Sequence, residues 1–273
     1  MSSLTKRILT AAALIPFVLW LVLLSPADVF IVIFSGVMLV AAFEWAGLSG
    51  ISQLIPKLLF AVLTVLASNL LLMANQPVLI AVLMTGLVYW LVLIGLIITV
   101  PRWLLSIKVK PFYMQFIGGF LLSLTFVSLV YLKQSVQEGD TALMYLLLLI
   151  WVADSGAYFS GRAFGKHKLS IHVSPAKSIE GLLGGMVLCL LLSLIAVGYF
   201  EQSQIALFTL FSLGVAWVSV YGDLFESLVK RRAGVKDSGH ILPGHGGILD
   251  RIDSLLAAAP FFVAFYILME LLS

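Results

Sequence analysis

The chain has 273 residues, of which 62% are hydrophobic and only 11% are charged. An ordinary soluble domain carries about 25% charged residues, so a soluble globule of this composition would lack the polar surface that it needs. The composition also excludes a disordered chain, and the single cysteine, Cys189, excludes a disulfide scaffold. We therefore predict an all-α polytopic membrane protein.

Nine apolar runs are long enough to cross a bilayer as helices, which takes about 20 residues each. They cover residues 8–24, 29–48, 56–74, 78–100, 113–132, 141–161, 180–200, 205–229 and 253–272. With the N-terminus in the cytoplasm, the inside segments 1–7, 49–57, 101–112, 162–179 and 230–252 hold all but one of the 16 Lys and Arg residues. Because cytoplasmic connections are enriched in these residues, we expect an N-in, C-out protein of the inner membrane.

The net charge of +3 does not indicate a nucleic-acid partner, because the basic residues lie in connections between apolar runs. We divide the chain into N-terminal transmembrane helices (1–112), a connecting transmembrane helix (113–140) and a catalytic transmembrane region (141–273). The outside connections, including 133–140 and 201–204, are short. The inside loops 162–179 and 230–252 are longer than a connection requires, which favours a cytoplasmic active site built from them.

Carboxylates at the inner ends of two spans are the first candidate site residues. Asp154 lies near the inner end of the sixth span, and Asp223 and Glu226 lie near the inner end of the eighth. A carboxylate at a helix centre costs about 2.5–3.5 kcal/mol, so these groups must face protein, water or a cation. Asp223, Glu226, Ser227 and Lys230 share one helix face. Two carboxylates on one face suit Mg²⁺; the alternative is a salt bridge from Glu226 to Lys230.

The loop 230–252 combines five glycines over 234–247 with several cations and carboxylates. Glycines let the backbone approach a ligand closely, and Lys230, Arg231, Lys236 and Arg251 suit phosphate oxygens. Asp250 and Asp253 are three residues apart at the start of the last span, where the alternative interpretation is that acids stabilise the N-terminal end of the helix dipole. These groups together are the equipment for a nucleoside triphosphate with Mg²⁺. The histidines are weaker candidates for bases: His240 and His245.

The loop 162–179 resembles a P-loop only superficially, because its glycine spacing is wrong and His167 follows the lysine. Ser174-Pro175 before Lys177 predicts a helix start. A lysine there opposes the helix dipole and so favours an anionic ligand, the alternative being simple positive-inside anchoring. Gly181 and the glycine four residues later favour helix packing.

Residues 227–253 resemble the signature of the phosphatidate cytidylyltransferase, or CDP-diacylglycerol synthase, family. That signature reads S-x-apolar-K-R, four free positions, K-D-x-small, two free positions, then apolar-P-x-H-G-G-apolar-x-D-R-apolar-D, and the chain matches every fixed position. The stretches 154–158, 165–168 and 174–181 also resemble the family. Ser178 and Ile179 depart from it, since relatives more often have Thr and an aromatic residue there.

The resemblance implies transfer of CMP from CTP to phosphatidic acid in phospholipid biosynthesis, with Mg²⁺ and a monovalent cation such as K⁺, by a homodimer in the lipid bilayer. It implies metal binding by Asp223 and Asp250. Lys230, Arg251 and His245 complete the candidate catalytic residues, with His245 shaping the loop or contacting a phosphate. The candidate substrate-binding residues are Asp154, Ser174, Lys177, Arg231, Lys236, Asp237, Gly246 and Gly247.

An ion-coupled transporter is the alternative function, with Asp154, Asp223 and Glu226 as a coupling-ion path. It predicts broken helices and an inverted repeat, and the sequence has neither feature. Glu44, beside Trp45 at the inner end of the second span, has no assigned role; such interfacial pairs are more often structural.

Overall fold

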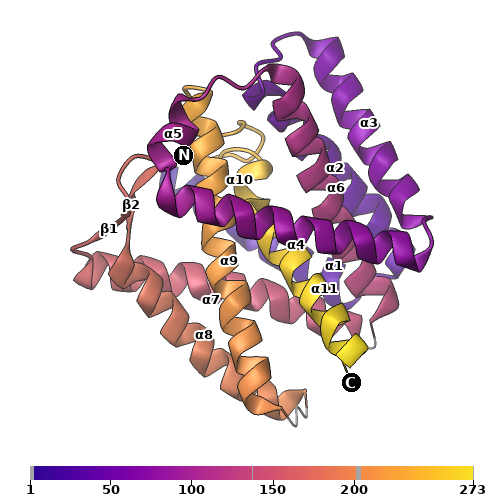
Figure 1. The fold of residues 1–273 in the computed structure, drawn as a ribbon, viewed down its shortest axis with the longest axis vertical. Helices are drawn as coiled ribbons and strands as arrows, with labels where there is room; N and C mark the ends of the chain where they lie inside the picture. The colour runs from indigo at the N-terminus through magenta and orange to yellow at the C-terminus, as the bar shows by residue number, and fades with distance from the viewer. Residues whose placement is uncertain (1–2, 137, 201–203, 273) are drawn as a thin grey trace.

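The computed structural model describes residues 3–136, 138–200 and 204–272. Within these ranges the long helices are α1 (Ser3–Leu23), α2 (Ala27–Leu48), α3 (Leu54–Leu72), α4 (Gln76–Thr99), α6 (Pro111–Ser135), α7 (Gly139–Phe164), α8 (Ile179–Tyr199), α9 (Ile205–Arg232) and α11 (Leu255–Leu272). Two short helices, α5 (Pro101–Ser106) and α10 (Leu249–Ile252), and an antiparallel hairpin, β1 (Lys168–Ser170) and β2 (Ser174–Ser178), lie between them (Figure 1).

Eight helical segments among the described residues are long and apolar enough to cross a membrane, α10 and α11 counting as one. The first predicted span coincides with α1, whose apolar part, Leu9–Leu23, is shorter. Lipid offers no hydrogen-bond partner, so these apolar runs satisfy their backbone groups inside helices. The prediction of an all-α polytopic membrane protein is confirmed, whereas the N-in, C-out orientation and the three-part division stay predictions. The predicted connection at 201–204 lies almost wholly outside the described residues.

The helix start predicted at Ser174-Pro175 is wrong. Residues 174–178 form β2, in which Ser174 pairs with Ser170 of β1. The helix begins only at Ile179, because the Ser178 side chain caps it by accepting a hydrogen bond from the Gly181 N–H at 3.1 Å. Lys177 therefore lies in a strand before the cap, and the argument from the helix dipole does not apply to it.

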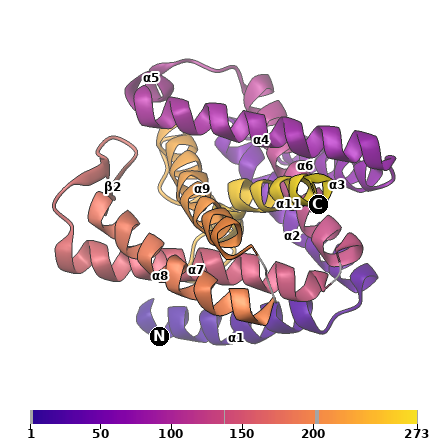
Figure 2. The same cartoon turned by 60° about the horizontal axis from the view of Figure 1, so that its bottom comes forward.

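Helices α9 and α11 lie in the middle of the molecule. Figure 2 shows α4 on one side of them and α7, α8 and α1 on the other. Two tryptophans pack against Phe225 of α9. The ring centroids of Trp45 of α2 and Trp90 of α4 lie 6.0 and 5.6 Å from that of Phe225. This buried aromatic contact joins the N-terminal helices to the helix that carries Asp223.

The connections predicted to share one side of the membrane contact one another. Arg102 donates a hydrogen bond to His172 at 2.6 Å. Arg232 donates to the carbonyls of Leu104 in α5 and of Ile107, the residue that follows this helix, at 2.7 Å each. Thr10 of α1 donates to the Pro243 carbonyl at 3.2 Å. The connections 101–112, 162–179 and 230–252 are therefore linked to one another, and Pro243 links the last of them to α1. The distribution of basic residues predicts such contacts for segments on one side.

The opposite ends of the helices meet around a buried lysine. Lys133 of α6 donates to the Val22 carbonyl of α1 at 2.8 Å and pairs with Asp140 of α7 at 2.6 Å. Lys133 is the one basic residue that the predicted topology places on the outside, and its charge is compensated by Asp140 of the same chain. This ion pair lies at the other end of α7 from Asp154.

Candidate active site

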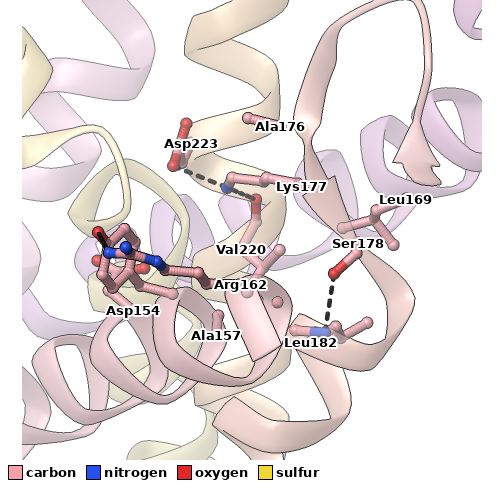
Figure 3. Close-up of a pocket in the computed structure, with 13 residues that line it drawn as sticks. Asp154, Ala157, Arg162, Leu169, Ala176, Lys177, Ser178, Leu182, Val220 and Asp223 are labelled. Carbon is pink, nitrogen blue, oxygen red and sulfur yellow. Dashed lines mark hydrogen bonds and ion pairs between the residues drawn. The ribbon is translucent and has the colours of Figure 1, made fainter. Parts of the chain in front are cut away.

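A cavity of about 430 Å³ lies between the last turns of α7, the hairpin, the start of α8 and the end of α9 (Figure 3). Its volume falls within the usual range for a small-molecule site. Four of the residues that line it are charged, and most of the others are small or apolar. The full lining consists of Asp154, Ala157, Tyr158, Gly161, Arg162, Leu169, Ala176, Lys177, Ser178, Gly181, Leu182, Val220 and Asp223.

An ion pair between Lys177 and Asp223 forms one wall of the cavity. Figure 3 shows Lys177 extending from β2 toward Asp223, and its Nζ lies 2.7 Å from Asp223 Oδ2. The ammonium also lies 3.5 Å from the Val220 carbonyl, and Ser227 donates to Asp223 Oδ1 at 3.2 Å. About a quarter of each charged side chain is exposed, 24% for Lys177 and 28% for Asp223. Both groups can therefore reach a ligand in the cavity.

Two further carboxylates surround this ion pair. Asp154 of α7 lies close enough to Lys177, Asp223 and Arg251 to interact electrostatically with each. Asp253, just before α11, interacts in the same way with Asp223, Lys177 and Asp154. Three carboxylates from different parts of the chain thus converge on Lys177, and the region favours further positive charge.

Close packing of α7 on α8 brings these groups together. A Cβ atom on Gly185 would lie 2.6 Å from the Ala153 carbonyl oxygen, and one on Gly181 would lie 2.8 Å from that of Ala157. Only glycine permits this approach of the two backbones. The predicted packing role of the glycines in α8 is confirmed, and it places Asp154 beside the hairpin.

The hairpin is fixed to α8 by Glu180. Its carboxylate accepts from the backbone N–H of Lys166 at 3.0 Å and contacts the His167 ring nitrogen at 2.5 Å.

Arg162, in the last turn of α7, donates to the Tyr158 hydroxyl at 3.3 Å and lines the cavity. Arg162 is a site residue that the sequence does not single out, because there it is one basic residue among several in the connection 162–179.

A second cluster of charged groups is buried next to the Asp223 turn of α9. Lys230 pairs with Glu226 within α9 and with Asp250 of α10, 2.6 Å from Oδ1. The salt bridge from Glu226 to Lys230, the alternative to a metal ligand at Glu226, is therefore present, and Glu226 is fully buried. The four residues predicted to share one face of α9 form two separate pairs. Ser227 donates a hydrogen bond to Asp223, whereas Lys230 pairs with Glu226.

Asp250 organises the loop before α10. Its Oδ2 accepts from the Ser238 N–H, the Ser238 hydroxyl and the Gly247 N–H at 2.8–2.9 Å. Gly246 has a φ of +82°, and a Cβ atom there would lie 2.6 Å from Asp250 Oδ2. Asp250 would have to release some of these donors to bind a cation, so its metal role stays a prediction.

The other predicted residues of this loop lie outside the cavity lining. Lys236, Asp237 and Arg251 are exposed, and Arg231 lies 3.5 Å from the Val173 carbonyl of the hairpin turn. His245 donates its backbone N–H to Leu242 at 2.9 Å, while its buried Nδ1 has no hydrogen-bond partner among the described residues. Ser174 is half-buried in β2. The structure therefore brings together Asp154, Lys177 and Asp223, with Lys230 and Asp250 in the adjoining cluster.

Ser238 and Glu44 are functional candidates that sequence reasoning did not select. Ser238 occupies a free position of the signature, so no motif marked it. Glu44 had a signal, namely a carboxylate inside an apolar span, which requires a specific partner. Its side chain is buried against the loop that precedes α10.

The family model described as "Cytidylyltransferase family" matches residues 5–269. The chain belongs to this family. It is 35% identical to a protein named phosphatidate cytidylyltransferase from Haemophilus influenzae, over 96% of the chain and 98% of that protein. A protein of the same name from Pseudomonas aeruginosa is 40% identical over 96% of both chains. One from Bacillus subtilis is 46% identical over half of each. No comparison supports the transporter alternative for this cytidylyltransferase family member.

Proposed function

We propose that this chain is a phosphatidate cytidylyltransferase, which transfers CMP from CTP to phosphatidic acid and releases pyrophosphate. The observation that carries the proposal is the Lys177–Asp223 ion pair in a cavity of about 430 Å³, which lies among helices long and apolar enough to cross a membrane. Relatives that match nearly the whole chain bear that name.

The reaction needs positioning and charge neutralisation more than proton transfer. A phosphatidate oxygen forms a bond to the α-phosphorus of CTP, and the bond from that phosphorus to the bridging oxygen of pyrophosphate breaks. A phosphate monoester is already ionised at pH 7, so no strong base is required. Lys177 and Arg162 line the cavity and would offset charge on the phosphates. Asp223 holds the Lys177 ammonium on the α9 side of the cavity.

Mg²⁺ fits this site as an ion shared between protein and phosphates. The described residues contain no group of three or more His, Cys, Asp or Glu side chains placed to hold a metal by themselves. Mg²⁺ is usually bound by one or two carboxylates together with substrate phosphates, and the half-buried Asp223 can supply one. When bound, the ion would neutralise developing phosphate charge. We retain Asp250 as the second proposed ligand and K⁺ as a proposed further cation.

The lipid would reach the site from the side. Leu169, Leu182 and Val220 give the cavity an apolar lining, and Tyr158 and Ile179 are exposed beside it. Such a surface suits acyl chains, while the charged groups suit the headgroup. We place this face on the cytoplasmic side of the inner membrane, because the basic connections meet there. The homodimer and the absence of a nucleic-acid partner also stay predictions.

The test uses purified protein, phosphatidic acid, Mg²⁺ and CTP labelled at either the α- or the γ-phosphorus. The proposal expects α-label in the lipid product and γ-label in pyrophosphate; γ-label in the lipid would instead indicate phosphoryl transfer. Parallel reactions with dCTP and UTP measure base and sugar selectivity. Ion flux in proteoliposomes without nucleotide, together with no lipid labelling, would contradict the proposal and support a transporter.

A further inference from the structure

Glu44 of α2 binds the loop that leads into α10. Its Oε1 accepts a hydrogen bond from the Ile248 N–H at 3.1 Å, and its Oε2 accepts from the Leu249 N–H at 2.8 Å. The Ser238 hydroxyl lies 3.1 Å from the same Oε2. Glu44 is only 5% exposed, so these hydrogen-bond donors compensate the burial of its carboxylate. A residue of the N-terminal helices thus binds both ends of a loop that lies 194 to 205 positions away in sequence.

Two glycines make this contact possible. A Cβ atom on Gly239 or on Gly247 would collide with the Glu44 carboxylate. The loop therefore closes around the carboxylate from both sides, and the glycines are the residues that let the backbone come so near. Such a fit requires Glu44 itself to be held in place.

The neighbouring residue holds it. Trp45 is fully buried, and its Nε1 donates to the Met114 carbonyl of α6 at 2.8 Å. Its ring packs against Phe225 of α9. Glu44 is thus presented from a rigid helix, which is the arrangement expected for a group that positions others.

The contacts of Glu44 continue directly to Asp250. The Ser238 hydroxyl contacts Glu44 Oε2 and also lies 2.9 Å from Asp250 Oδ2. Gly247, which packs on Glu44, donates its N–H to the same Asp250 oxygen. From Asp250 the network reaches Lys230 of α9.

We infer that Glu44 is a positioning residue for nucleotidyl transfer: it holds Ser238 and the start of α10 so that Asp250 and Arg251 keep their place beside the cavity. The inference rests on the proposed function. Lys177 and Arg162, which would bind the triphosphate, lie on other elements. Loss of Glu44 should therefore lower kcat more than it raises the KM for CTP.

The experiment compares Glu44→Gln and Glu44→Ala with the wild type in the full-length, detergent-purified protein. Gln keeps one acceptor oxygen but turns an amide donor toward backbone N–H groups or the Ser238 hydroxyl. We expect kcat to fall about tenfold for Gln and further for Ala, with a smaller change in KM, as weakening of an interaction in the transition state requires. Amide hydrogen exchange over residues 236–250 should accelerate in both variants.

Lys133→Met is the matched control, since Lys133 is also a buried charged residue at a helix contact but lies at the far end of α7. It should lower thermal stability while leaving kcat and loop exchange unchanged. Wild-type kcat and exchange in Glu44→Ala, or an equal loss of kcat in Lys133→Met, would overturn the inference. The two claims fail in different ways. An inactive wild type would overturn the proposed function. An active wild type with an equally active Glu44→Gln would overturn only the role inferred for Glu44.

Discussion

Lys230 Nζ lies 2.6 Å from Asp250 Oδ1, and the same ammonium pairs with Glu226 one turn earlier on α9. Lys230 and Asp250 are only 9% exposed, and Glu226 is fully buried. One cation therefore compensates two buried carboxylates and ties the end of α9 to the start of the last transmembrane segment. Lys230 therefore links the buried part of α9 to the Asp250 carboxylate that accepts hydrogen bonds from the loop.

Lys230→Met should destabilise the protein strongly. Removing one partner from a buried ion pair costs about 3–5 kcal/mol, because the remaining charge is left without compensation, and here two carboxylates lose their cation. We expect a large drop in the apparent Tm in detergent and loss of nucleotidyl transfer.

Glu226→Gln separates the two pairs. Lys230 keeps Asp250 in that variant, so the loss of apparent Tm should be smaller than for Lys230→Met. The double variant Lys230→Met/Glu226→Gln should regain part of the lost stability, because one unpaired charge is gone. Equal Tm values for Lys230→Met and the double variant would contradict this assignment.

Gly185→Ala should disturb the cavity by separating α7 from α8. The added methyl group would lie 2.6 Å from the Ala153 carbonyl oxygen, and overpacking of this kind costs about 1–3 kcal/mol. We expect a lower apparent Tm and reduced transfer, since Asp154 and the hairpin are brought together by this contact. Gly198→Ala is the control on the same helix: nothing lies within 4 Å of its Cβ position, and it should keep wild-type activity.

Gly239→Ala tests the packing of the loop on Glu44. The methyl group would overlap the Glu44 carboxylate, so either the loop or the carboxylate must move. We expect about a tenfold decrease in kcat, equivalent to about 1.4 kcal/mol. Gly36→Ala, in the same helix as Glu44, has open space around its Cβ position and should be silent. A fully active Gly239→Ala would show that the loop tolerates the displacement.

Removal of divalent cations should stop the reaction and readdition of Mg²⁺ should restore it. Asp223→Asn should raise the Mg²⁺ concentration needed for half-maximal rate, because it removes a carboxylate that faces the cavity. Undiminished turnover after exhaustive chelation would contradict the proposed metal, and an unchanged Mg²⁺ dependence in Asp223→Asn would contradict the ligand.

The sequence was sufficient to predict the helices because their signals are local and strong. Long apolar runs must form helices in lipid, and the basic residues of 101–112, 162–179 and 230–252 correctly grouped connections that contact one another. The common face of Asp223, Glu226, Ser227 and Lys230 also followed from helical periodicity alone. Residues in a shared signature, such as Asp250, were found through resemblance.

The partnerships of these residues could not be predicted. No local sequence pattern predicts that Lys177 pairs with Asp223 or that Lys230 joins Glu226 to Asp250. Each contact depends on how elements far apart in sequence pack together. Ser174-Pro175 predicts a helix start where the chain forms β2, because pairing with β1 leaves no periodic signal in so short a strand. The role of Glu44 could not be predicted for a similar reason: its hydrogen-bond donors, two backbone N–H groups and the Ser238 hydroxyl, belong to a loop far away in sequence.

The most direct test of the central claim compares Lys177→Met with Lys133→Met in the CTP and phosphatidic acid assay. Both lysines pair with an aspartate: Lys177 of β2 with Asp223 of α9 in the cavity, and Lys133 of α6 with Asp140 at the start of α7. Loss of one preorganised charge contact in a reacting site typically lowers the rate about 10²–10³-fold. We therefore expect the kcat/KM of Lys177→Met to fall by that factor. Lys133→Met should keep the wild-type kcat/KM once activity is normalised to folded protein. Equal activity of the two variants would contradict a catalytic centre in the cavity beside Asp223.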